Sequence, residues 1–375
     1  MNQDQQSLDL HRQKRGKIRI SPTVNITSKK NLSLIYSPGV ATPAKKIAEN
    51  KEEAHTYTSK TRNVAIVTDG SAVLGLGNVG PEASIPVMEG KAALFKELAG
   101  IDGYPIPLHV ETAQETIQVV KAITPFYNGI NLEDIKAPQC FHILEKLQEL
   151  DIPVFHDDQH GTAIVILTAL LNAMNLTKKQ KDEKIVVNGA GAAGIATTQL
   201  LLKAGYTDIL VLDSKGILTP TRTDQNKYKQ RIAKKTNPDG KQGNLQDAIK
   251  DAGVFIGVST GNILTEKDVK RMKQDPIIFA LANPIPEIDP EIAQRAGAKI
   301  IATGRSDYPN QVNNALIFPG LFKGLIENGK KNVTNEDMVN IARSLSEIVT
   351  PTPTNILPDV FNKDVVPTIV EALKR

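Results

Sequence analysis

Short apolar runs that end in glycine or polar residues recur through the first part of the chain, with amphipathic segments between them. Such runs predict buried β-strands, whereas apolar positions three or four residues apart predict helices. The expected strands are 63–70, 104–110 and 151–158, and the expected helices are 89–100 and 138–150. Residues 1–30 are mostly polar and predict a partly ordered arm. Residues 1–161 as a whole predict an N-terminal α/β domain.

From residue 162 onward, helix and strand patterns alternate more regularly. Helix patterns cover 162–175 and 192–205. Strand patterns cover 184–191, 208–214, 252–259, 277–284 and 299–304. Because each strand pattern leads into a polar or glycine-rich loop, residues 162–375 predict a doubly wound parallel sheet, a Rossmann-like domain, followed by C-terminal helices.

Composition narrows the class of protein without identifying it. The 375 residues are 40% hydrophobic and 23% charged, as is typical of a globular protein, and the net charge of +4 is spread along the chain. We therefore expect no nucleic-acid interface. The single cysteine, Cys140, fits a reducing cytoplasm, and the polar N-terminus and short apolar runs predict neither a signal peptide nor a membrane span. The basic segment 221–244 is interpreted as a solvated helix and loop.

The segment "VVNGAGAAGIAT" carries a G-x-G-x-x-G turn formed by Gly189, Gly191 and Gly194. It follows a predicted strand and opens a predicted helix, which is the context of a dinucleotide phosphate site. Asp213 ends the next strand 22 residues after Gly191, where a carboxylate accepts the ribose hydroxyls of NAD. Lys215 follows closely and could tolerate the extra phosphate of NADP. The pattern favours NAD and leaves NADP open.

Two pairs of adjacent acids follow predicted strands. Glu133 and Asp134 form one pair, and Asp157 and Asp158 form the other. Adjacent carboxylates at the edge of a core repel each other and are costly to bury unpaired. An oxygen-rich group of this kind suits Mg²⁺ or Mn²⁺ better than zinc. A solvated turn or a helix cap is the alternative for either pair.

Three further features are candidates for the same centre. Lys91 follows Gly90 at the expected start of a helix, where the helix dipole would lower the pKa of the lysine toward that of a base. Tyr36 lies at a Ser-Pro-Gly turn, where a lone tyrosine is usually structural. The glycine-rich segment 67–83 has no strand–helix context, so we interpret it as an active-site wall or a structural loop.

The motifs "SLIYSPGVATP", "VTDGSAVLGLGNVGPEASIPVMEGKAALFKELAGID", "GINLEDIKAPQCFHILEKL", "DIPVFHDDQHGTAIV", "VVNGAGAAG", "FALANPIPEI" and "NQVNNALIFPG" occur in this order from about residue 30. Together they resemble the short bacterial-type malic enzymes, a group related to soluble oxaloacetate decarboxylases. The resemblance implies oxidative decarboxylation of (S)-malate to pyruvate and CO₂ with NAD or NADP and with Mg²⁺ or Mn²⁺. It also implies a homodimer.

The resemblance assigns roles to the acids and to their neighbours. Glu133, Asp134 and Asp158 would hold the metal. Lys91 would act as the general base and Tyr36 as the general acid.

The resemblance also covers further residues of the expected site. Asp157 would lie beside the metal and tune the lysine. Ala192 and Ala193 belong to the nucleotide turn, and Asn283 and Asn314 would contact substrate or nicotinamide.

One position departs from the pattern. Longer relatives align an arginine that grips the substrate carboxylate with a loop that here offers Ser71 and Ala72. Two alternatives therefore stay open beside malate oxidation. One is a metal-dependent oxaloacetate decarboxylase, and the other is a nucleotide-sensing regulator without turnover.

Overall fold

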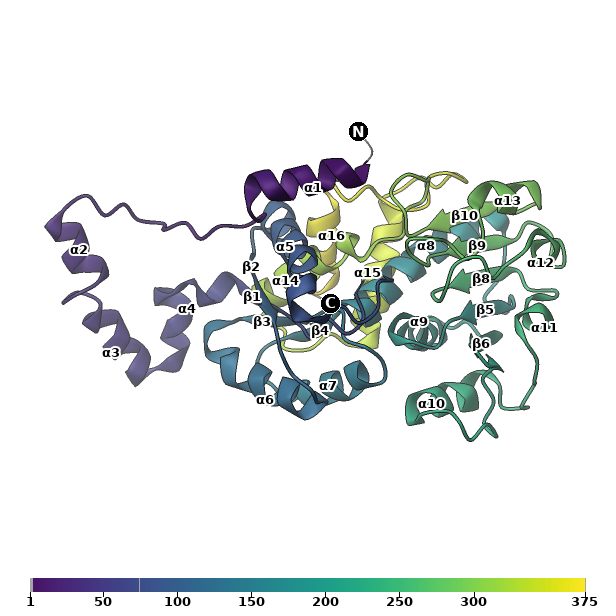
Figure 1. Cartoon of the computed structure of the whole chain (residues 1–375), viewed down its shortest axis with the longest axis horizontal. Helices are drawn as coiled ribbons and strands as arrows, with labels where there is room; N and C mark the ends of the chain where they lie inside the picture. The colour runs from purple at the N-terminus through teal and green to yellow at the C-terminus, as the bar shows by residue number, and fades with distance from the viewer. Residues whose placement is uncertain (1–2, 74, 375) are drawn as a thin grey trace.

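A four-stranded parallel sheet forms the centre of the N-terminal part of the protein, and its strand order is β2-β1-β3-β4. The computed structural model describes residues 3–73 and 75–374 (Figure 1). The strands are β1 (Asn63–Thr68), β2 (Asp102–Pro107), β3 (Gly129–Leu132) and β4 (Val154–His156). The helices between them are α5 (Gly80–Ala99), α6 (Ala113–Ile123) and α7 (Gln139–Leu147). Every residue of β1 is buried, as expected of a central strand covered on both faces.

A six-stranded sheet with the order β10-β9-β8-β5-β6-β7 follows, and all its pairings are parallel except that of β6 with β7. Its strands are β5 (Ile185–Asn188), β6 (Ile209–Asp213), β7 (Gly216–Ile217), β8 (Val254–Gly257), β9 (Ile277–Ala280) and β10 (Ile300–Thr303). Its helices are α9 (Ala192–Lys203), α10 (Lys227–Thr236), α11 (Leu245–Ile249), α12 (Glu266–Val269) and α13 (Pro290–Arg295). The predicted Rossmann-like sheet is confirmed.

The two sheets are joined by the buried helix α8 (Thr162–Thr177), which continues from a π-helical turn, η4 (Asp157–Gly161). By length and composition, Asp157–Thr177 is the one helix among the described residues that could cross a membrane. Most of it (67%) is buried, and it packs against α9, so its place in the core accounts for its apolar character. The predicted boundary at 161/162 falls where α8 begins and stays a prediction.

The C-terminal helices return to the first sheet. They are α14 (Phe318–Glu327), α15 (Asn335–Glu347) and α16 (Val365–Ala372). Helix α14 packs on α5, where the rings of Phe95 and Phe318 meet edge to face with centroids 4.7 Å apart. Helix α15 packs on α8. One hydrophobic core therefore includes side chains from the first sheet and from the C-terminal helices.

The N-terminal arm lies mostly outside this core (Figure 1). Its helical segments are α1 (Gln3–Lys14), α2 (Lys29–Ile35), α3 (Ala41–Glu49), η1 (Lys51–Glu53), α4 (Ala54–Tyr57) and η2 (Ser59–Arg62), and none of their residues is buried. Next to α1, the Lys17 backbone N–H donates to Glu89 of α5 at 3.0 Å. Helices α2 to α4 project away from the sheets.

Candidate active site

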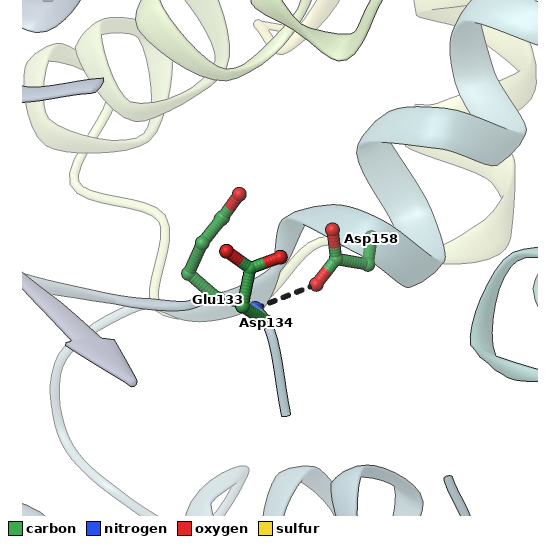
Figure 2. Close-up of side chains that lie close together, drawn as sticks. All are labelled: Glu133, Asp134 and Asp158. Atoms are coloured by element: carbon green, nitrogen blue, oxygen red, sulfur yellow. Dashed lines mark hydrogen bonds between the residues drawn. The ribbon is translucent and has the colours of Figure 1, made fainter. Parts of the chain in front are cut away.

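Glu133, Asp134 and Asp158 lie close together where the neighbouring strands β3 and β4 end (Figure 2). Leu132 pairs with His156, so the residues that follow β3 and β4 emerge at the same edge of the sheet. One carboxylate oxygen from each of Glu133, Asp134 and Asp158 lies within 4.8 Å of the others. The backbone N–H of Asp134 donates to Asp158 at 2.8 Å and fixes the two loops relative to each other. The structure thus brings the three predicted metal ligands together.

The surroundings of this carboxylate group favour a bound cation. Burial raises the pKa of both Glu133 and Asp158, and repulsion from a second carboxylate adds to it, from Asp158 for Glu133 and from Asp157 for Asp158. The nearby imidazoles of the buried His156 and the half-buried His160 do not offset the charge, because desolvation lowers the pKa of His156 to about 3 and that of His160 to about 4. Three oxygen donors without nitrogen or sulfur suit Mg²⁺ or Mn²⁺. The residues present therefore fit the expected metal.

Lys91 lies in the middle of α5, which begins at Gly80, so the expectation that it starts a helix is wrong. Its Nζ contacts Glu133 at 2.8 Å and also contacts Asp157, and it lies 4.0 Å from the centre of the Phe318 ring. Burial opposes the charged form, but the two carboxylates outweigh it and raise the pKa of Lys91. The expected lowering by a helix dipole is therefore wrong as well.

Asp157 and Asp158 are the first two residues of the π-helical turn, and their side chains have different partners. Asp158 turns toward the carboxylate group, whereas Asp157 contacts Lys91 and is fully buried. Burial raises the pKa of Asp157 to about 7, with the attraction of Lys91 acting in the opposite direction. A Cβ at Gly161 would lie 1.8 Å from Asp157 Oδ1, so this close approach requires glycine.

The glycine turn between β5 and α9 has the form expected of a phosphate cradle. Gly189 has a φ of +121°, and a Cβ at Gly194 would lie 1.7 Å from the Gly189 carbonyl oxygen. A Cβ at Gly191 would meet nothing within 4 Å, so space lies open beside it. Ala192 and Ala193 form the first turn of α9, whose N-terminus favours phosphate.

A cleft of about 840 Å³ runs along this turn. Gly189 and Gly191 line it together with Asp213 at the end of β6 and with Ala137 and Pro138, which follow the carboxylate group along the chain. The arrangement fits a dinucleotide. Helix α9 also packs on the turn Asp157–Gly161, so the nucleotide turn and the carboxylate group share a boundary.

The two asparagines lie in different places. Asn314 opens a short 3₁₀ turn, η5 (Asn314–Leu316), beside the turn of Asp157, where a Cβ at Gly161 would lie 3.4 Å from its Cβ. Asn283 follows β9, and a Cβ at Gly75 would lie 2.0 Å from its carbonyl oxygen. The glycine-rich loop of the first sheet therefore lies against the second sheet's Asn283 loop.

Tyr36 is not brought to Lys91 within one chain. It ends α2 on the projecting arm, and 69% of it is exposed (Figure 1).

Two residues at the centre were missed. Asn131 Nδ2 donates to Glu133 at 2.9 Å, and its place two residues earlier in the same strand run could have indicated a shared face. Phe318, which covers Lys91, gives no sequence signal because its contact depends on the return of α14.

Known proteins match both halves of the chain. Residues 15–118 match the family model "Malic enzyme, N-terminal domain", and residues 159–372 match "Malic enzyme, NAD binding domain". The sheet, the glycine turn and the carboxylate group thus belong to a nucleotide-binding enzyme class. The chain belongs to the malic enzyme family, as its motifs predict.

Two relatives and one solved structure match over most of their length. The chain is 50% identical to an NAD-dependent malic enzyme of Geobacillus stearothermophilus, over 96% of this chain and 76% of that one. It is 48% identical to a bifunctional malic/malolactic enzyme of Bacillus subtilis, over 100% and 93%. The crystal structure of an NAD-dependent malic enzyme from Thermotoga maritima superposes with a TM-score of 0.95 at 48% identity, covering 98% of both chains.

Proposed function

We propose that the protein catalyses the oxidative decarboxylation of (S)-malate to pyruvate and CO₂, with reduction of NAD and with Mg²⁺ or Mn²⁺ at the carboxylate group. Malate oxidation is the family's reaction. The observation that carries the proposal is the contact of Lys91 with both Glu133 and Asp157 beside the nucleotide turn. Through Glu133, the contact connects the amine of Lys91 with the group of three carboxylates. Through Asp157, whose turn packs on α9, it connects the amine with the dinucleotide site.

Lys91 is the proposed general base. Its Nζ takes the proton of the malate hydroxyl as hydride leaves the carbon that bears this hydroxyl for the nicotinamide. Glu133 contacts this Nζ and also belongs to the carboxylate group, so a cation held there reduces the negative charge that favours protonated Lys91. Asp157 and the Phe318 ring keep the amine in place.

Glu133, Asp134 and Asp158 are the proposed metal ligands. A bound Mg²⁺ or Mn²⁺ would supply Lewis-acid stabilisation of the charge that develops as CO₂ departs.

Because this chain lacks the arginine of the longer relatives, other groups are proposed to bind the substrate carboxylate. Ser71 Oγ donates to Asp69 at 2.5 Å and accepts from the Lys136 backbone N–H at 2.9 Å, so it is engaged in its own loop. Asn314, next to the turn of Asp157, is the nearer asparagine for substrate. Asn283 is proposed to contact substrate or nicotinamide.

The proposed assembly is a homodimer in which Tyr36 acts as general acid in the site of the other chain. Tyr36 is exposed on an arm that projects from its own sheets (Figure 1). Apolar side chains near it are exposed as well, namely Leu32, Leu34, Ile35 and Val40. An arm of this kind gains stability by packing on a partner.

Mixing two inactive variants tests the assembly. Tyr36→Phe and Lys91→Ala should each lower malate turnover by about 10²- to 10⁴-fold. Co-refolded together, they should regain roughly a quarter of the wild-type rate, because about half the dimers are mixed and each mixed dimer holds one intact site. Each variant co-refolded with itself is the control, and no recovery in the mixture would place both residues in one chain.

The direct test of activity measures reduced nicotinamide formed from malate, Mn²⁺ and NAD or NADP. In parallel, pyruvate is measured from oxaloacetate without nucleotide. Malate-dependent reduction is the expected result. Brisk decarboxylation of oxaloacetate without any reduction would instead identify the lyase, and inactivity on both substrates would identify a sensor.

A further inference from the structure

A buried carboxylate that the proposed reaction does not use lies in the loop after β9. Glu287 is fully buried over the end of β8, where a Cβ at Gly257 would lie 2.4 Å from Glu287 Cδ. Burial raises the pKa of Glu287, while backbone hydrogen bonds from Ala282 and Ser259 act in the opposite direction. All the hydrogen bonds that the structure describes at this carboxylate come from neutral donors. Because burying a carboxylate is costly without hydrogen bonds, the donors and their loops are fixed around it.

The donors to Glu287 belong to loops that follow two neighbouring strands. The Ser259 backbone N–H, two residues after β8, donates to Oε1 at 3.0 Å. The Ala282 backbone N–H, two residues after β9, donates to Oε2 at 2.9 Å. Each carboxylate oxygen therefore holds one loop, and the carboxylate sets the distance between the two loops.

A third strand is joined through the Ser259 side chain. Asn188, at the end of β5, donates through Nδ2 to Ser259 Oγ at 2.7 Å. This hydroxyl in turn lies 3.5 Å from Glu287 Oε1. We call Asn188, Ser259, Ala282 and Glu287 the strand-end network. It connects the carboxyl ends of the adjacent strands β5, β8 and β9 (Figure 1).

The strand-end network lies between two parts of the proposed dinucleotide site. Asn188 directly precedes Gly189 of the glycine turn, and Asn188, Gly189 and Ser259 line the cleft. Ala282 directly precedes Asn283, the exposed residue that is proposed to contact substrate or nicotinamide. Ligands of parallel sheets bind at the carboxyl ends of the strands, so a connection between these ends sets the relative positions of the ligand contacts.

We propose that Glu287 is a positioning residue for hydride transfer, which holds the Asn283 loop in register with the glycine turn. This inference rests on the proposed oxidation of malate and adds a residue that acts through Asn283. Hydride transfer requires close approach of the nicotinamide and the reacting carbon, and a displacement of about 1 Å can lower a rate about 100-fold. A loop that is bound to a buried carboxylate resists such a displacement.

Glu287→Gln tests the proposal, because it keeps the size of the side chain but replaces one acceptor oxygen with an amino group. One of the two backbone N–H groups then loses its partner, and kcat for malate oxidation should fall by roughly 10- to 100-fold. Affinity for ADP-ribose, which lacks the nicotinamide, should change less than about threefold in titration calorimetry. Glu287→Asp keeps the charge but withdraws the carboxylate by one methylene group, and it should lower kcat as well. Wild-type kcat in both variants would overturn the proposal.

A double variant shows whether Glu287 acts through the Asn283 loop. Asn283→Ala alone should lower kcat. Adding Glu287→Gln to it should lower kcat less than about threefold further, as expected for residues that act as a unit. Losses that multiply in the double variant would contradict the proposal, and so would an unchanged kcat in Asn283→Ala.

Asp268→Asn is the matched control for a loss of stability alone. Asp268 is a buried acid on α12 of the same domain, and it accepts from the Thr265 backbone N–H at 2.9 Å and from the Thr265 hydroxyl at 2.6 Å. Thermal unfolding should show a loss of stability in this variant, whereas its kcat should equal that of the wild type. An equal fall of kcat in the control would reduce Glu287 to a structural role and overturn the proposal. A wild type that reduces no nucleotide with malate would instead overturn the proposed function itself.

Discussion

Asp213 and the group of Glu133, Asp134 and Asp158 are both acidic sites at the carboxyl ends of parallel strands, yet their charges are offset differently. At Asp213, Arg222 and Lys229 lower the pKa of the carboxylate. In the Glu133 group, burial and repulsion from a neighbouring carboxylate raise the pKa values of Glu133 and Asp158. The first site supplies its own cations, whereas the second has a deficit that a divalent ion can fill.

The difference teaches that an acid after a strand does not by itself define a metal site. The segment that covers the strand end determines whether the acid is paired by cations of the chain. Residues 221–244 bring cations over Asp213, whereas Lys91 is shared between Glu133 and Asp157. An acid after a strand is therefore paired by cations of the chain in one domain and belongs to the proposed metal site in the other.

Among the tests of this comparison, the largest expected effect comes from removing a ligand of the proposed metal. Asp158→Ala should weaken Mn²⁺ binding by roughly 100-fold, because the remaining carboxylates cannot complete the oxygen shell. Titration calorimetry with Mn²⁺ measures the change. Asp151 is an exposed acid just before β4, the strand that precedes Asp158. Asp151→Ala is therefore the control and should bind Mn²⁺ normally. Equal affinity in both variants would remove Asp158 from the metal site.

The packing of Asp157 gives the next effect. In Gly161→Ala, the new methyl group would meet the Asp157 carboxylate and lower the free energy of unfolding by about 2 kcal/mol. Thermal unfolding measures the loss. Gly90→Ala on helix α5 is the control, because its Cβ would meet only the Lys17 amine at 3.6 Å and alanine favours a helix. If both variants were as stable as the wild type, the close approach at Gly161 would not matter.

Much of the fold could be predicted because buried strands have a strong sequence pattern. The strands around Asn188, Asp213 and Ala280 lie where their apolar runs place them. The gathering of Glu133, Asp134 and Asp158 could be expected for the same reason, since acids that directly follow neighbouring parallel strands emerge at one edge. Their proposed role as metal ligands came from the family resemblance. The glycine turn carries its own geometry in its spacing.

Other features depend on contacts that the pattern does not contain. Lys91 looked like the start of a helix because Gly90 precedes it, but α5 begins at Gly80 and continues through Gly90. Residues 221–244 look solvated, and helix α10 forms there, yet Arg222 and Lys229 turn toward Asp213. The solvated interpretation of this segment is therefore wrong at those two residues. The arm of Tyr36 has no buried face in one chain that could place it.

The smallest expected effect concerns the pH dependence of the contacts of Asp213 with Arg222 and Lys229. Because the pKa of Asp213 is lower in the folded state than the value of about 3.9 in the unfolded chain, its charge stabilises the fold above that pH. Asp213→Asn should lower the free energy of unfolding by about 1 kcal/mol at neutral pH. The difference should shrink as the pH falls below about 4 and vanish below the folded pKa, because protonated Asp213 then resembles asparagine. Urea unfolding at several pH values measures it, with the exposed Asp239→Asn as a control. A difference that persisted unchanged in acid would mean that shape, and not charge, joins Asp213 to its two cations.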